Sequence, residues 1–263
     1  MPLQYKLGVV GNPIAHSMSP QIHQQFAEQL GVSISYDKFL IEPDKLHHFI
    51  HYFFQQGGHG LNITLPFKQQ IIESVDQLTP LANKIQSVNT IFLDDKKQLI
   101  GDSTDGLGLL DDLSANSFEI KNKNILILGA GGSCRSVAYS MLESGAKLSV
   151  YNRTKEKSHL LVEEFKDLGS IALFESDSHS FDGIINTTTK WDDEDFLKKL
   201  NLNQKAFVYD LNYGQRADDF NKLITKIGIE NYADGKGMLI SQAAYAFFRW
   251  TGKMPDTRSV SLD

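Results

Sequence analysis

The sequence predicts an α/β fold with two units, each built from its own run of strands and helices. Short apolar segments that stop at glycine or proline alternate with amphipathic segments over residues 1–104. The same alternation begins again at the apolar segment that ends at Leu128. Strand–helix–strand alternation is typical of a mainly parallel sheet covered by helices, so we expect one such sheet in each unit.

The elements of the first unit follow from their end signals. The first strand stops at Gly11-Asn12-Pro13, and Ser19-Pro20 predicts a helix start, because serine caps helices and proline fits the first helical positions. A later helix carries one apolar stripe and ends at Gly57-Gly58. The expected strands are 6–11, 33–41 and 60–65. One expected helix starts at Ser19, and a second carries the apolar stripe of Leu46, Phe49, Ile50, Phe53 and Phe54.

The second unit shows the same alternation, with a boundary near residue 104. Its last segment is one apolar helix, MLISQAAYAFFRW. The expected strands are 125–128, 147–151, 171–174, 183–186 and 207–211, and the expected helices are 133–144, 155–168 and 237–252.

Composition excludes several classes of protein. The chain has 26 Lys and Arg against 32 Asp and Glu, a formal charge of −6, which argues against a nucleic-acid or membrane-surface partner. Cys134 is the single cysteine, so no internal disulfide can form. Neither a signal peptide nor a membrane helix is expected, and we predict a cytoplasmic monomer or homodimer. His47 and His51 lack further ligands at metal-binding spacing, so no metal site is expected.

A glycine turn follows the strand that ends at Leu128, and a helix is expected directly after it. Backbone N–H groups and the positive end of a helix can hold a pyrophosphate in this arrangement. Cys134 stands where the full fingerprint has glycine or alanine, so a turn without a ligand remains the alternative. The turn comprises Gly129, Ala130, Gly131 and Gly132, and Ser133 opens the helix.

The segment after the next strand favours NADP over NAD. Asn152 stands where an NAD site has an acidic residue, roughly 20 residues past the first glycine. Arg153 follows it, with Lys155 and Lys157 just beyond. An arginine grips the 2′-phosphate of NADP with two hydrogen bonds, whereas a carboxylate would repel it. A solvated basic helix start is the alternative.

Polar segments of the first unit predict a hydroxylated, anionic substrate. Ser17 and Ser19 place two hydroxyls at a helix N-terminus, which suits a carboxylate, although Ser19 could also cap its helix. Asn62 and Thr64 share one face at the carboxyl end of a strand, where ligands of open α/β sheets bind. Asn89 adds a second amide for the recognition of hydroxyls.

Lys68 and Asp105 are the pair that we expect to move a proton. When hydride leaves a carbinol carbon, the alcohol proton must pass to a positioned base. In the reverse direction Lys68 would donate this proton, and Asp105 would orient both Lys68 and the reacting hydroxyl. Such pairs titrate together, so the sequence leaves open which member holds the proton at each stage.

Motifs along nearly the whole chain resemble the shikimate dehydrogenase family, which uses NADP. They are GNPIAHSMSP, NITLPFK, SVNT, GDSTDG, GAGG, NRTK and DGKGMLISQAAYAFFRWTG, in this order. The resemblance implies the reversible, NADPH-dependent reduction of 3-dehydroshikimate to shikimate, in the biosynthesis of chorismate and the aromatic amino acids. It also implies a substrate domain of residues 1–104 and 237–263, with a Rossmann-type NADP domain of residues 105–236 inserted between its two parts.

The resemblance also implies roles for individual residues. The family's catalytic pair matches Lys68 and Asp105, and its carboxylate-binding serines match Ser17 and Ser19. The expected substrate-hydroxyl contacts are Asn62, Thr64, Asn89 and Gln242, and Tyr213 is a further expected residue of the substrate site. The expected cofactor site comprises Gly129, Ala130, Gly131, Gly132, Ser133, Asn152, Arg153, Thr154, Lys157, Thr187 and Gly235.

Three departures from the family pattern leave two other functions open. The departures are Thr189-Lys190 beside the expected nicotinamide wall, Gln215 and Ala217 after Tyr213, and Ser103 in the catalytic loop. One alternative is a quinate/shikimate dehydrogenase with broader substrate or NAD use, against which Arg153 argues. The other is a catalytically silent module that binds NADP and a metabolite, against which the presence of both Lys68 and Asp105 argues.

Overall fold

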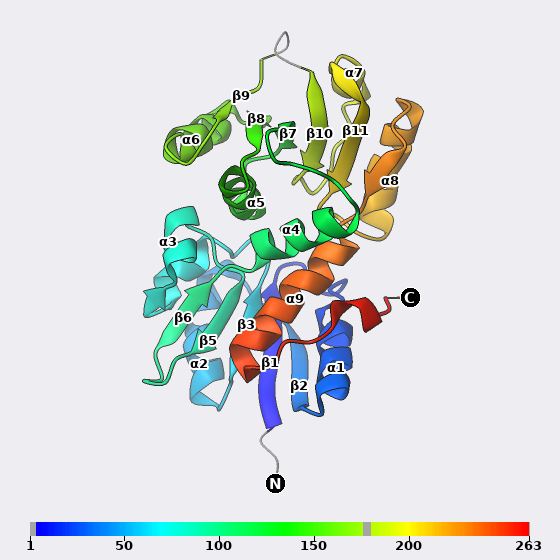
Figure 1. Ribbon diagram of the computed structural model, residues 1–263. Helices are drawn as coiled ribbons and strands as arrows, with labels where there is room; N and C mark the ends of the chain where they lie inside the picture. The colour runs from blue at the N-terminus through cyan, green and yellow to red at the C-terminus, as the bar shows by residue number, and fades with distance from the viewer. Residues whose placement is uncertain (1–3, 176–179, 263) are drawn as a thin grey trace. The chain divides into compact units, whose positions relative to one another are not determined.

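The computed structural model in Figure 1 describes residues 4–175 and 180–262. The chain divides into two compact units: Met1–Gly108 with Leu239–Asp263, and Leu109–Met238. The divisions fall inside helix α4 (Asp105–Ala115) and near the start of helix α9 (Lys236–Thr251). Each unit contains a six-stranded sheet with helices, so the predicted α/β fold is confirmed.

The sheet of the first unit has the strand order β2-β1-β3-β5-β6-β4. β1 pairs in parallel with β2 and β3, and β4 with β6, whereas β5 runs antiparallel to both of its neighbours. The sequence analysis missed β4, β5 and β6, because strands of two to four residues are too short to show a period. The bounds are β1 (Gln4–Gly11), β2 (Ser33–Leu40), β3 (Gly60–Ile63), β4 (Gln77–Leu78), β5 (Thr90–Leu93) and β6 (Leu99–Asp102).

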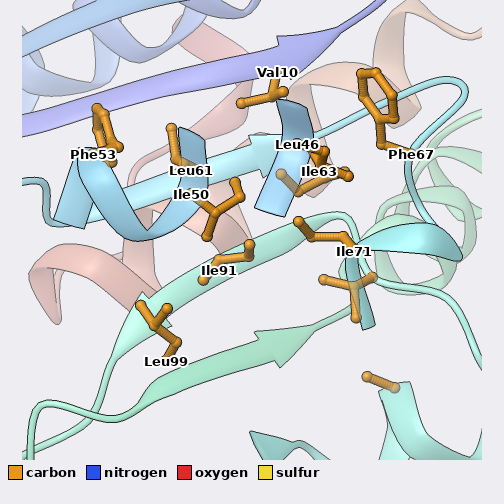
Figure 2. Packing of buried hydrophobic residues seen from close by; sticks show 12 residues of the cluster. Val10, Leu46, Ile50, Phe53, Leu61, Ile63, Phe67, Ile71, Ile91 and Leu99 are labelled. Carbon is orange, nitrogen blue, oxygen red and sulfur yellow. The ribbon is translucent and has the colours of Figure 1, made fainter. Parts of the chain in front are cut away.

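Helix α2 covers one face of this sheet through the apolar stripe seen in the sequence. Figure 2 shows Leu46, Ile50 and Phe53 of α2 directed at side chains of the strands. Val10 of β1 and Ile63 of β3 belong to the same buried cluster. The helical segments are α1 (Ser19–Leu30), α2 (Leu46–Gln55), α3 (Pro80–Ile85) and the 3₁₀ turns η1 (Pro43–Lys45), η2 (Gln70–Ser74) and η3 (Thr257–Ser259).

Helices α1 and α9 cover the opposite face. Phe26 of α1 packs against Phe247 of α9, with their ring centroids 5.8 Å apart. Trp250 of α9 packs against Leu7 of β1, and its Nε1 donates to the backbone oxygen of Ile91. Because successive strand residues face opposite ways, the side chain next to a core residue of β3 faces α1 and α9. Asn62 occupies this position.

The second unit has a fully parallel sheet in the order β12-β11-β10-β7-β8-β9. This order is that of a doubly wound sheet. Successive strands are added on one side of β7 as far as β9 and then, from β10 onward, on its other side, so the switch point lies between β7 and β10. The strands are β7 (Asn124–Leu128), β8 (Lys147–Tyr151), β9 (Ile171–Leu173), β10 (Phe181–Asn186), β11 (Leu202–Asp210) and β12 (Asn231–Ala233). The helices are α5 (Gly132–Glu143), α6 (Lys155–Phe165), α7 (Glu194–Lys198) and α8 (Gln215–Lys226).

Several element ends differ from those expected from the sequence. Helix α1 begins at Ser19 itself with Met18 at the cap position, so Ser19 is not the N-cap residue. Strand β3 ends at Ile63, two residues before the expected end at 65, and the backbone oxygen of Thr64 then accepts a turn hydrogen bond from the N–H of Phe67. Helix α6 ends at Phe165, three residues before the expected end at 168. Within the described ranges, no helix has the length and apolarity to cross a membrane.

Candidate functional site

The first unit brings Lys68 and Asp105 together as a buried ion pair. Lys68 Nζ donates to Asp105 Oδ2 over 2.6 Å, and the two side chains are 11% and 6% exposed. Lys68 follows β3 and is fixed beside the fully buried Phe67, while its backbone oxygen accepts a hydrogen bond from Val88. Asp105 is the first residue of α4, where the helix dipole favours a negative charge.

Asn89 holds the other oxygen of the same carboxylate. Its Nδ2 donates to Asp105 Oδ1 over 2.8 Å, while its Oδ1 accepts from the backbone N–H of Thr104 over 2.9 Å. Gln242 of α9 completes this group, since its Oε1 lies 3.2 Å from Asn89 Nδ2. The polar residue in the apolar C-terminal helix therefore has a buried partner, and four of the predicted site residues lie together.

Asn62 is held by two residues that the sequence analysis did not select. Its Oδ1 accepts from Tyr36 Oη over 2.7 Å and from His23 Nε2 over 3.2 Å, while its Nδ2 donates to the backbone oxygen of Asn89. Complete burial lowers the pKa of His23 to about 3, against the opposing effect of the Asn62 bond, so His23 is neutral at pH 7. The sequence signal was a histidine next to Ile22 on the apolar side of a helix.

The two serines lie close together at the start of α1. Ser17 Oγ donates to Ser19 Oγ over 3.1 Å, and the backbone N–H of Ser19 donates back to Ser17 Oγ over 3.3 Å. Burial raises the pKa of Tyr36, and a hydrogen bond with Ser19 opposes this shift. Hydrogen bonds therefore lead from Ser19 through Tyr36 to Asn62. Thr64 is half-buried, and its methyl group lies against Gly11.

In the second unit, the glycine turn is required by the fold and leaves open space beside it. Gly129 has φ +111°, and a Cβ there would lie 2.3 Å from Thr187 Oγ1. A Cβ on Gly131 would meet nothing within 4 Å, so the backbone at Gly131 is open to a ligand. Helix α5 begins at Gly132, and the first turn of a helix suits a phosphate. These features fit a dinucleotide pyrophosphate.

The Asn152–Thr154 segment lies at the same edge of the sheet as the glycine turn. The backbone N–H of Gly129 donates to the oxygen of Tyr151, the last residue of β8. Asn152 Nδ2 donates to the Thr154 oxygen over 2.8 Å and shapes the turn, while the side chain of Arg153 is exposed. Thr154 and Lys157 are also exposed near the start of α6.

The remaining expected cofactor residues follow the carboxyl ends of β7, β10 and β12. Thr187 Oγ1 donates to the backbone oxygen of Leu128 over 2.8 Å. The backbone N–H of Gly235 donates to the oxygen of Asn212 over 2.8 Å, and a Cβ on Gly235 would lie 2.3 Å from the oxygen of Leu211. Ala130 lies within the glycine turn, and Ser133 is the second residue of α5. Tyr213 belongs to the second unit, and its part in substrate binding stays a prediction.

Cys134 is a packing residue. Its thiol is fully buried and donates to the backbone oxygen of Gly129, and burial raises its pKa to about 12. A thiol with such a pKa carries no thiolate at neutral pH and is a poor nucleophile. Among residues 4–175 and 180–262, no three His, Cys, Asp or Glu side chains gather as a metal site.

The structure bears on the surroundings of two of the departures from the family pattern. Trp191, next to Thr189-Lys190, is buried among Tyr151 and Phe196 in the core of the second unit. Ala217 is buried in the first turn of α8, where a larger side chain would have to displace its neighbours. Nothing in the structure explains the serine at Ser103.

Three family models match successive parts of the chain. The shikimate dehydrogenase substrate binding domain matches residues 9–91, and the shikimate / quinate 5-dehydrogenase model matches residues 112–190. The shikimate 5'-dehydrogenase C-terminal domain matches residues 235–260. The matches thus fall in both compact units.

Relatives and solved structures agree with these models. The chain is 38% identical over 257 residues to the shikimate dehydrogenase (NADP(+)) of Buchnera aphidicola subsp. Acyrthosiphon pisum (strain Tuc7), and the match covers 96% of this chain and 94% of the relative. Shikimate 5-dehydrogenase from Thermus thermophilus, in complex with NADP(H) and shikimate, superposes with a TM-score of 0.84 at 29% identity, covering 97% and 96% of the two chains. An Ael1 enzyme from Pseudomonas putida gives 0.84 at 32% identity, with the same coverage.

A doubly wound cofactor unit joined to a unit with a buried lysine–carboxylate pair is the architecture of an NADP-dependent oxidoreductase. The relatives identify the family within this class of enzymes. The chain belongs to the shikimate dehydrogenase family.

Proposed function

We propose that this chain catalyses the reversible, NADPH-dependent reduction of 3-dehydroshikimate to shikimate, a step in the biosynthesis of chorismate and the aromatic amino acids. The observation that carries the proposal is the buried contact of 2.6 Å between Lys68 and Asp105 in a member of this family. In this proposal, residues 1–104 and 237–263 bind the substrate, and residues 105–236 bind NADP. The protein acts in the cytoplasm as a monomer or homodimer, without a nucleic-acid or membrane partner.

The residues of the second unit suit NADP. Bound NADPH supplies the hydride. The open backbone at Gly131 and the start of α5 suit the pyrophosphate, and the exposed guanidinium of Arg153 suits the 2′-phosphate. The proposed cofactor contacts are Gly129, Ala130, Gly131, Gly132, Ser133, Asn152, Arg153, Thr154, Lys157, Thr187 and Gly235.

The residues of the first unit suit an acid with several hydroxyls. Ser17 and Ser19 offer hydroxyl donors to the carboxylate at the positive end of α1. The further proposed substrate contacts are Asn62, Thr64, Asn89, Tyr213 and Gln242. A site that recognises hydroxyl groups through buried amides discriminates strongly against analogues that lack them, since the amides are then left unpaired.

Lys68 moves the proton in the proposed reaction. During reduction, its Nζ donates a proton to the carbonyl oxygen of the substrate as that oxygen becomes an alcohol. Asp105 holds Lys68 in place through Oδ2, and Asn89 holds Asp105 through Oδ1. In the oxidation of shikimate, Lys68 accepts the alcohol proton.

A crossed absorbance assay tests this function. Shikimate and quinate are each offered with NADP and with NAD, and formation of the reduced nicotinamide is followed. Shikimate with NADP should give the highest kcat/KM. Comparable turnover of quinate or comparable use of NAD would favour the broader enzyme, and saturable binding of both ligands without turnover would favour a silent binding module.

A further inference from the structure

Asp210 is a fully buried carboxyl at the carboxyl end of β11 that the sequence analysis did not select. Its Oδ1 accepts from Asn186 Nδ2 over 3.0 Å and from Asn212, through the backbone N–H over 3.1 Å and Nδ2 over 2.8 Å. Its Oδ2 is buried and has no hydrogen-bond partner among the described residues. A buried carboxyl with one oxygen unpaired is costly, so its retention calls for an explanation.

The partners of Asp210 connect the segments that follow β10 and β11. Asn186 ends β10, and its Oδ1 accepts from Thr188, through the backbone N–H over 3.1 Å and Oγ1 over 2.6 Å. Asn212 Nδ2 also donates to the backbone oxygen of Thr188 over 2.8 Å. One carboxyl thus joins two loops that follow neighbouring parallel strands.

These loops contain residues expected to contact the cofactor. Thr187 lies between Asn186 and Thr188, and its hydroxyl lies beside the turn at Gly129. On the other loop, Asn212 accepts a hydrogen bond from the backbone N–H of Gly235 over 2.8 Å. Asp210 therefore bonds directly to Asn186, which precedes Thr187 in the chain, and to Asn212, which holds the backbone of Gly235.

The topology assigns these loops to one half of a dinucleotide. A doubly wound sheet binds one mononucleotide over each half, on either side of the switch point. Arg153 follows β8, on the side of the sheet expected to bind the adenosine 2′-phosphate. Asp210 ends β11, on the other side, where the nicotinamide half would lie.

The surroundings of Asp210 favour its neutral form. Burial raises the pKa of Asp210 to about 7, and the charge of Asp234 acts in the same direction, against the hydrogen bonds from Asn212 and Asn186. Tyr232 of β12 also interacts with Asp210, while its hydroxyl donates to the backbone oxygen of Ala217 over 3.2 Å.

We propose that Asp210 is a positioning residue for the nicotinamide half of the cofactor, acting through Asn186 and Asn212 on the loops that carry Thr187 and Tyr213. The inference rests on the proposed function only in taking NADP as the dinucleotide. Asp210 itself contacts neither cofactor nor substrate in this proposal. Its effect should therefore be confined to the nicotinamide half.

Calorimetric titration with NADP and with 2′,5′-ADP tests this assignment. The second probe carries the adenosine and its 2′-phosphate but no nicotinamide. Asp210→Ala should weaken NADP binding about tenfold or more and leave 2′,5′-ADP affinity within about twofold, since it removes buried hydrogen bonds from one half only. Asp210→Asn should retain NADP affinity, because its amide can accept at Oδ1 and donate from Nδ2.

Asp182→Ala is the matched control at the opposite end of the sheet. Asp182 also accepts two hydrogen bonds, from Asn124 over 2.9 Å and from Asn203 over 2.7 Å, but near the amino end of β10. It should leave the affinity for both probes unchanged. Asn212→Ala removes the side-chain hydrogen bond between Asn212 and Asp210 from the Asn212 side. It should show the same pattern of affinities as Asp210→Ala, and it tests the proposal if Asp210→Ala fails to fold.

Two results would overturn the proposal. One is an unchanged NADP affinity in Asp210→Ala or Asn212→Ala, and the other is an equal loss of affinity for NADP and for 2′,5′-ADP in whichever variant folds. An inactive Asp210→Asn protein with wild-type affinity for NADP would equally contradict a role in positioning alone. These titrations need no turnover, so a chain inactive with shikimate still tests Asp210. A wild-type chain that binds neither probe would contradict the NADP assignment itself.

Discussion

Lys68 Nζ lies 2.6 Å from Asp105 Oδ2, although the two residues are 37 positions apart in the chain. The contact joins the segment after β3 to the first residue of α4, and Asn89 holds the second carboxylate oxygen over 2.8 Å. Removing one partner of a buried ion pair leaves the other charge poorly solvated, so the pair is sensitive to substitution.

Lys68→Ala should abolish turnover while the affinity for shikimate stays within about tenfold of wild type. Lysine acts mainly on the proton that moves in the transition state, so kcat falls much more than binding. Steady-state kinetics and calorimetric titration with shikimate measure the two effects. Lys84→Ala, at an exposed lysine of the same unit, is the control. An active Lys68→Ala protein would remove the role assigned to Lys68.

Arg153→Ala should raise the KM for NADP far more than the KM for NAD. Arg153 is exposed, so the substitution costs little stability and removes the guanidinium proposed for the 2′-phosphate. Kinetics with both cofactors measure the ratio, and Lys147→Ala, at the other end of β8, should change neither value. Equal effects on both cofactors would argue against the 2′-phosphate contact.

Gly129→Ala and Gly131→Ala should separate folding from cofactor binding. At Gly129, φ is +111° and the new Cβ would lie 2.3 Å from Thr187 Oγ1, so the free energy of unfolding should fall by about 1–3 kcal/mol or more. Gly131 has φ −91° and open space beside it, so Gly131→Ala should keep its stability and lose NADP affinity. Urea denaturation and calorimetry measure the two quantities. The reverse pattern would contradict the roles assigned to the two glycines.

Acid should destabilise the first unit through His23. Its pKa is about 3 in the folded protein against 6.5 for the free side chain, so only the unfolded chain binds the proton between these values. The part of the free energy of unfolding that is linked to His23 is complete above pH 6.5. It is lost as the pH falls, by about 2 kcal/mol between pH 7 and pH 5. His23→Phe should remove this dependence.

Trp250 can report on this unit alone. The chain has two tryptophans, and Trp191 lies in the other unit. In a Trp191→Phe background, urea denaturation followed by Trp250 fluorescence at both pH values gives the difference in stability between chains with and without the His23→Phe substitution. A difference independent of pH would show that the pKa of His23 is the same in the folded and the unfolded chain.

Much of the fold was predictable because local patterns report it. The apolar stripe of α2 and the glycine turn after β7 follow from residue spacing alone. The short strands β4 to β6 were missed, because their pairing depends on distant partners rather than on a local period. His23 and Asp210 were missed for a related reason: one histidine or aspartate has no local signature of burial.

The sequence by itself determined the class of fold, the family and the residue types available for proton transfer and phosphate binding. Tertiary structure decided which of them meet: Lys68 with Asp105, Asn89 with Gln242, and Tyr36 with His23 at Asn62. Local patterns arise from backbone geometry and burial over a few residues, whereas these contacts depend on strand register and helix packing across the chain. The same holds for Asp210, whose burial and hydrogen bonds come from the neighbouring strands.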